Sequence, residues 1–172
     1  MSSNKFLSFS RETVPVELPT HREWFNYFGP KSCAMVAIAL STGLPKEFIY
    51  QQASLEITPS RWQSTGTPLH VIRKILNRLR VTYIHHADKL TVRYERKFVD
   101  DGYCKFWTMV PKYLTETQFK NSHLCDKTKT YLVCNHDHAW VIKNGVTLDP
   151  IWYVSNKQTS KRRIEDVIEI RM

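Results

Sequence analysis

The sequence lacks any long apolar run, and this absence limits what the protein can be. No stretch of its 172 residues approaches the roughly 18 apolar residues that a membrane-spanning helix requires. Residues 1–6 also lack the hydrophobic segment of a secretory signal peptide. We therefore expect a cytoplasmic protein that makes no use of a membrane.

Cysteine is scarce, with four in the whole chain: Cys33, Cys104, Cys125 and Cys134. Without a secretion signal, we expect reduced thiols rather than two disulfides. No repeat, low-complexity tract or long linker divides the chain, and its length suffices to bury a core without a metal or a disulfide. The interpretation is an irregular arm over residues 1–25, continuing to about Gly29, and a single domain over residues 26–172.

Basic residues outnumber acidic ones by 25 to 16, which gives a net charge of +9. Such a balance attracts anionic partners but carries no information about the fold. The basic surface favours a protein or peptide partner of acidic character. The sequence does not indicate an oligomeric state.

Three helices are expected in the first half of the chain. Residues 33–40 are apolar almost all round, as in a helix buried in the core, and Gly43 and Pro45 follow as terminators. A second helix is predicted over residues 45–56, with Phe48, Ile49 and Ala53 as its inner face. A third is predicted over residues 67–79, where apolar residues recur at helical spacing.

The second half reads as strands. Residues 81–84, 106–110 and 131–134 are rich in β-branched and aromatic side chains. Asn144-Gly145 lies between two further apolar runs, which is the strongest short signal for a β-hairpin. Helices followed by an antiparallel sheet indicate the α+β class.

Three side chains could form a catalytic triad. Cys33 begins the apolar helix, where the positive end of the helix dipole favours a thiolate. With Asn144-Gly145 as a two-residue turn, His138 and Asp149 fall on one face of the hairpin, as diagonal neighbours about 7–8 Å apart at the backbone. His138 would then be the base and Asp149 the residue that orients it.

These residues resemble a known family. Residues 29–37 look like the nucleophile helix of papain-like bacterial cysteine peptidases, and residues 66–79 resemble the second helix of the bacteriocin-processing branch. The run from His138 to Ile142, followed by Thr147 to Pro150, is similar to the ending of that branch. The resemblance covers about residues 26–153. It implies a papain-like fold and a peptidase that cleaves peptide or isopeptide bonds through a thioester on Cys33, without a cofactor.

The chain departs from the family pattern near the cysteine. Ala34 stands where the family has glycine, and Tyr27 stands where it has the glutamine that donates to the oxyanion. The neighbouring Asn26 carries an amide that can donate equally well, so Asn26 is the candidate oxyanion-hole residue. Without a donor there, the fold would be a slow or inactive enzyme that acts as a binding module. Thioester chemistry serves hydrolysis, acyl transfer to an amine and deamidation equally.

Two alternatives from other classes stay open. Cys125, Cys134, His136 and His138 are zinc-ligand types, although their spacing matches no standard zinc finger. The basic residues of the third helix, together with residues 161–163, offer charge for nucleic acid, but no recognised nucleic-acid motif accompanies them.

Overall fold

The computed structural model describes residues 21–86, 89–149 and 162–171 of the chain. Five of the helices in these ranges precede the first strand. None of them is long and apolar enough to cross a membrane. The elements are α1 (His21–Phe28), α2 (Cys33–Thr42), α3 (Lys46–Ser54), α4 (Pro59–Thr65), α5 (Leu69–Arg78), β1 (Thr82–His85), β2 (Thr91–Asp100), β3 (Lys105–Tyr113), α6 (Glu116–Lys120), β4 (Thr130–Cys134), β5 (Ala139–Lys143), β6 (Val146–Leu148) and β7 (Asp166–Arg171).

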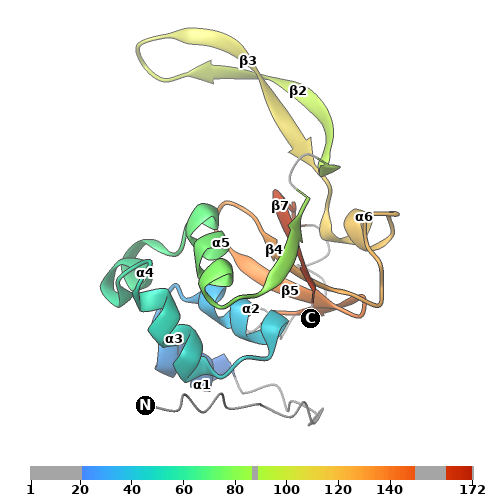
Figure 1. Ribbon diagram of the computed structural model, residues 1–172. Coiled ribbons are helices and arrows are strands. Elements are labelled where there is room, and N and C mark those ends of the chain that lie inside the picture. Colours follow the sequence, from blue (N-terminus) through green and yellow to red (C-terminus); the bar gives the residue numbers. More distant parts are fainter. Residues whose placement is uncertain (1–20, 87–88, 150–161, 172) are drawn as a thin grey trace, which may run out of the picture.

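Five strands form one antiparallel sheet in the order β1-β7-β4-β5-β6. Helices α1 to α5 gather on one side of this sheet, and α2 packs directly against β4 and β5 (Figure 1). The expected α+β class is confirmed. The last strand in the chain, β7, lies inside the sheet between β1 and β4.

The sheet is buried on both faces. From β4, Leu132 and Cys134 pack into the core beneath the helices, whereas Tyr131 and Val133 pack into a second core together with Phe119 of α6. A strand covered on both sides carries a continuous apolar run instead of an alternating one. This explains why β4 reads as an unbroken apolar segment.

The predicted α2 and α3 are confirmed, with one exception on α3. Gly43 follows α2 with a φ of 65°, a left-handed conformation that favours glycine, and Pro45 immediately precedes α3. Ile49 and Ala53 are buried as expected, but Phe48 is 40% exposed, so its place on the inner face was wrong.

The N-terminal region differs from the sequence prediction. Residues 21–28 form α1, which crosses the predicted boundary at residue 26, and its last residue, Phe28, is fully buried in the core. The predicted arm is therefore wrong for these residues, and residues 1–20 lie outside the described part. Helix α4 was not predicted, although its Trp62 is also fully buried. The predicted third helix corresponds to α5.

Strands β2 and β3 form a separate two-stranded sheet that projects from the rest of the molecule (Figure 1). The predicted strand at residues 106–110 lies within β3, but β2 and β7 were not predicted. Apolar and charged side chains in β2 do not alternate regularly, so its sequence does not indicate a strand (Thr91–Asp100, TVRYERKFVD).

Candidate active site

The β5–β6 hairpin forms with the predicted register. Lys143 pairs with Val146, and the pairing continues to Val141 and Leu148. Asn144 and Gly145 both have positive φ angles, 53° and 74°, as a two-residue turn of this type requires. The register is therefore unbroken along the paired residues, and His138 and Asp149 lie just beyond its end.

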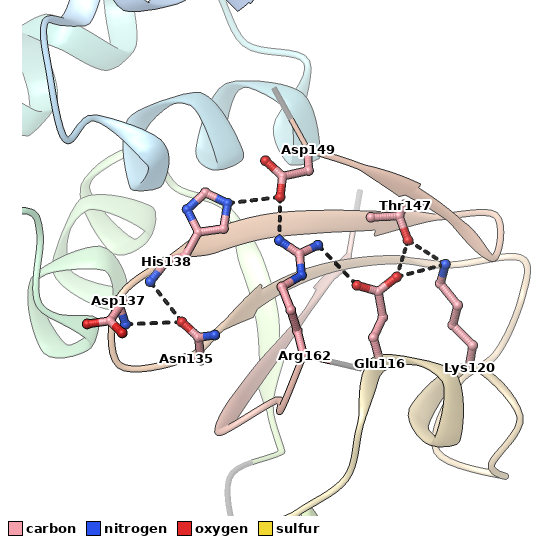
Figure 2. Close-up of polar contacts among 8 residues, drawn as sticks. All are labelled: Glu116, Lys120, Asn135, Asp137, His138, Thr147, Asp149 and Arg162. Atoms are coloured by element: carbon pink, nitrogen blue, oxygen red, sulfur yellow. Dashed lines mark hydrogen bonds and ion pairs between the residues drawn. The ribbon is translucent and has the colours of Figure 1, made fainter. Parts of the chain in front are cut away.

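His138 and Asp149 meet at that end of the hairpin. His138 Nε2 lies 2.9 Å from Asp149 Oδ2, and the two side chains are only 11% and 2% exposed (Figure 2). The turn between β4 and β5 fixes the backbone of His138, because its N–H donates to Asn135 Oδ1 at 2.8 Å and its carbonyl accepts from the Asn135 N–H at 2.9 Å. The predicted proximity of His138 and Asp149 is confirmed.

Cys33, the third residue of the predicted triad, comes from helix α2. It is the first residue of α2 and is partly exposed, and it is one of the two residues whose interactions raise the pKa of His138. Burial of the ring lowers the pKa of His138, but the hydrogen bonds and negative charges of Asp149 and Cys33 outweigh this effect and raise that pKa from 6.5 to about 9. The imidazole is therefore protonated at neutral pH, facing a carboxylate and a sulfur.

Helix α4 holds the turn that precedes Cys33. The carbonyl of Phe28 accepts hydrogen bonds from Trp62 Nε1 and from Gln63 Nε2, both at 3.0 Å. Gly29 follows with a φ of 85°, and a β-carbon there would lie 2.4 Å from Gln63 Nε2. A side chain at position 29 would thus be strained by the positive φ and would displace the Gln63 side chain that bonds to Phe28.

The first turn of α2 offers backbone donors next to the thiol. Ser32 donates its hydroxyl to the carbonyl of Gly29 at 2.6 Å, and no side chain caps the helix. The first N–H groups of a helix have no partner within it. Those near Cys33 are free to donate to an oxyanion that forms at the thiol.

Asn26, the predicted side-chain donor, is not brought to the thiol by any contact that the structure describes. It is an exposed residue of α1, and no hydrogen bond among the described residues joins it to Cys33 or His138. Its predicted role in an oxyanion hole therefore has no support from the geometry. Gln63, the amide side chain nearest the turn, is already bonded to Phe28.

Arg162, one of the residues whose charge the sequence offers to nucleic acid, belongs to this site. Its side chain is 14% exposed, and its Nη1 donates to the same Asp149 oxygen that His138 contacts (Figure 2). Nη2 donates to Glu116 Oε2 at 3.1 Å. The guanidinium also lies over the ring of Trp140, 4.1 Å from its centroid, and Trp140 stacks on His138.

Glu116 is the next member of this hydrogen-bonded network, because it binds Arg162. It is 2% exposed, and its Oε1 accepts a hydrogen bond from Thr147 and pairs with Lys120 at 3.0 Å (Figure 2). A capping box at Thr115 and Gln118 holds the first turn of α6, which carries Glu116. That Thr-x-x-Gln spacing is the one sequence signal that could have located this end of the network.

The zinc alternative is not supported by the geometry. Cys125 and Cys134 pack in the two different cores on opposite faces of the sheet, and His136 is exposed. Over residues 21–86, 89–149 and 162–171, no three His, Cys, Asp or Glu side chains gather closely enough to hold a metal ion. His138 is bound to Asp149 instead.

The basic groups assigned to nucleic acid are partly used within the fold. Arg78 pairs with Glu56 at 2.7 Å, Arg73 lies 3.5 Å from a ring nitrogen of His85, and Arg162 is buried as described above. Lys161 lies outside the described residues.

Comparisons of the chain with protein families, with curated proteins and with solved structures found no match.

Proposed function

We propose that this protein is a cysteine peptidase, a thiol hydrolase of peptide or isopeptide bonds built on a papain-like fold. The observation that carries the proposal is the His138 imidazole, which hydrogen-bonds to Asp149 and whose pKa is raised by both Asp149 and Cys33, although Cys33 lies far from the other two in the sequence. Nucleophile, base and orienting carboxylate in this order define a cysteine-based triad.

The chemistry follows from the protonation state of the ring. Because the pKa of His138 is about 9, its imidazole carries a proton at neutral pH that can pass to the leaving group. Cys33 attacks in the thiolate form, which is the nucleophilic form of a cysteine. The sulfur bonds to the carbonyl carbon, and the carbonyl oxygen takes up the electron pair beside the N–H groups of α2. The leaving amine departs with the proton of His138, which leaves a thioester on Cys33.

Water then resolves the thioester. His138, now neutral, takes a proton from water, the hydroxide attacks the thioester, and the carboxylic acid leaves as the thiolate returns. Asp149 keeps one ring nitrogen in place through both halves of the reaction. Arg162 is a positioning residue, since it holds the Asp149 carboxylate and does not face the sulfur.

The test compares the four cysteines within one protein. At pH 6, where an ordinary thiol is almost wholly protonated, iodoacetamide should modify Cys33 faster than Cys104, although Cys104 is the more exposed of the two. Burial raises the pKa of both Cys125 and Cys134, so these two should stay unmodified. Peptide mass spectrometry gives the rate at each position.

His138→Ala should slow the modification of Cys33 and leave that of Cys104 unchanged. His136→Ala is the matched control, because His136 is exposed and lies two residues away. A peptide-based electrophile that mimics an acyl substrate should label the same cysteine. Equal rates at Cys33 and Cys104 in the unaltered protein would refute the proposal.

A further inference from the structure

The projecting β2–β3 hairpin has two chemically different faces. Directly opposed residues of an antiparallel pair point to the same side, and successive residues alternate. The register pairs Tyr94 with Pro111, Arg96 with Met109 and Phe98 with Trp107. One side, which we call the aromatic face, therefore carries Tyr94, Arg96, Phe98, Trp107, Met109 and Pro111, with the Asp100–Lys105 ion pair beside the turn. The other, the charged face, carries Arg93, Glu95, Lys97, Val99, Phe106, Thr108, Val110 and Lys112.

The aromatic face is open to solvent. Its large side chains Tyr94, Phe98, Trp107 and Met109 are each about half exposed or more. Phe98 and Trp107 contact each other edge to face with ring centroids 5.2 Å apart, so they form a continuous apolar surface. A contiguous exposed apolar surface on a protein marks a place of interaction.

The composition of this face favours a protein as its partner. Tyr, Trp, Phe, Met and Arg are the residue types enriched at protein interfaces, and lysine and glutamate are depleted there. Here the lysines and the glutamate of the strand interiors lie on the charged face, where Glu95 pairs with Arg93 at 2.7 Å and also with Lys112. A single-stranded nucleic acid would need several cations along its phosphates, and the middle of the aromatic face offers Arg96 alone.

Arg96 indicates the charge of the partner. Its guanidinium lies over Trp107, 4.7 Å from the ring centroid, and no carboxylate in the described part of the chain lies within ion-pair distance of it. An apolar segment that also carries a carboxylate would satisfy both the rings and the arginine. The net charge of +9 would attract such a segment from a distance.

The size of the face favours a transient contact over a stable dimer. With about 3.4 Å per residue along β2 and about 4.8 Å between strands, one face of the hairpin measures roughly 300 Å². Two copies pressed together would bury about 600 Å² in total, well under the roughly 1,200 Å² of a stable interface. A contact of this size suits a protein that binds, reacts and leaves.

We propose that the aromatic face of the β2–β3 hairpin docks an apolar, acidic segment of a protein substrate. The proposal rests on the proposed function only in identifying that segment as part of the substrate. The hairpin would hold the substrate while another part of it enters the site at Cys33, so affinity would come from a surface outside the catalytic group.

Binding is measured on the full chain carrying Cys33→Ala, so that no turnover is needed. The probe is a fluorescent synthetic peptide in which leucine alternates with glutamate, and its counterpart has lysine in place of glutamate. We expect the glutamate peptide to bind more tightly, and Phe98→Ser to weaken it about tenfold, the loss typical of an interface hot spot. Arg96→Glu should reverse the preference between the two peptides.

Phe106→Ser is the matched control. Phe106 is 46% exposed against 47% for Phe98, and it lies on the charged face of the same hairpin. It should change binding by less than about twofold. The proposal is overturned if neither peptide binds, if the two serine variants lose affinity equally, or if Arg96→Glu leaves the preference unchanged.

Two other occupants have their own signatures. A dimer in sedimentation experiments that only Phe98→Ser abolishes would assign the face to a second copy. A labelled single-stranded oligonucleotide that binds more tightly than the glutamate peptide, and is weakened by Phe98→Ser, would assign it to nucleic acid. Either result would overturn the substrate assignment. Because Cys33 reactivity is a separate measurement, docking and catalysis can fail independently.

Discussion

Arg162 and His138 share a single oxygen atom, Oδ2 of Asp149. The carboxylate is 2% exposed, so it is held by two cationic groups in a site with almost no water. The arginine keeps its charge at any ordinary pH, whereas the imidazole gains and loses a proton. Asp149 is therefore kept in place in both protonation states of His138.

The titration of His138 is the most direct test of this arrangement. Its imidazole resonances should titrate with a midpoint at a pH of about 9 in NMR spectra. Asp149→Asn should lower that midpoint, because burial then acts against the imidazolium without the neighbouring carboxylate. Asp137→Asn is the control, since Asp137 is exposed and adjacent in the chain. A midpoint unchanged by Asp149→Asn would contradict the hydrogen-bonded pair.

The stability of the protein should depend on pH through the same group. The pKa of His138 is about 9 in the folded state and 6.5 without its partners. Its stabilising contribution is therefore complete below pH 6.5 and is lost as the pH rises through about 9. At about 1.4 kcal/mol per pKa unit, that contribution is on the order of 3 kcal/mol. Urea unfolding of the protein and of His138→Ala across this range should show the difference between them shrinking, and a constant difference would argue against it.

Replacing Arg162 should be costly although arginine is usually a surface residue. Arg162→Met would leave the buried carboxylates of Asp149 and Glu116 without their shared cation, and we expect a loss of about 3 kcal/mol in the free energy of unfolding. Arg163→Met should cost less than about 1 kcal/mol, because Arg163 is exposed and donates to a backbone carbonyl. Adding Glu116→Gln to Arg162→Met should recover part of the loss. If Arg162→Met and Arg163→Met cost the same, the buried network has no energetic role.

Gly29 offers a test of how α4 positions the thiol. Gly29→Ala and Gly43→Ala both place a side chain at a positive φ, which costs about 1 kcal/mol. Only at position 29 would the new β-carbon also strike Gln63, whereas position 43 faces open space. We expect Gly29→Ala alone to slow the modification of Cys33 by iodoacetamide. Gln63→Ala in the same chain should relieve the clash, and the absence of any relief would show that the contact with α4 is unimportant.

The parts of the site that the sequence predicted are those set by local signals. Asn144-Gly145 determines its own turn, and the turn determines which residues of the hairpin face each other. An apolar run that begins at Cys33 and stops at Gly43 defines its helix without reference to the rest of the chain. The position of Cys33 beside His138 then required only that this helix pack on the sheet.

The parts that were missed depend on contacts between distant segments. The sequence does not show whether an arginine is enclosed or exposed. The two carboxylates that bind Arg162 are 13 and 46 positions away in the chain. Strand β7 mixes acidic and apolar residues because Asp166 and Glu169 bond to His85 and His86. Strand β2 does not pack on a hydrophobic core, so its apolar and polar residues need not alternate. Asn26 was chosen by its distance from Cys33 along the chain, which did not predict its exposed position on α1.

The place of β7 in the sheet also affects how the protein matures. Cys33 and its helix leave the ribosome well before Arg162 and the strand that joins β1 to β4. Until that strand inserts, the sheet is split, Asp149 lacks its arginine, and His138 has no fixed carboxylate. A nascent chain would thus carry Cys33 without a completed His138–Asp149–Arg162 group until β7 has been synthesised.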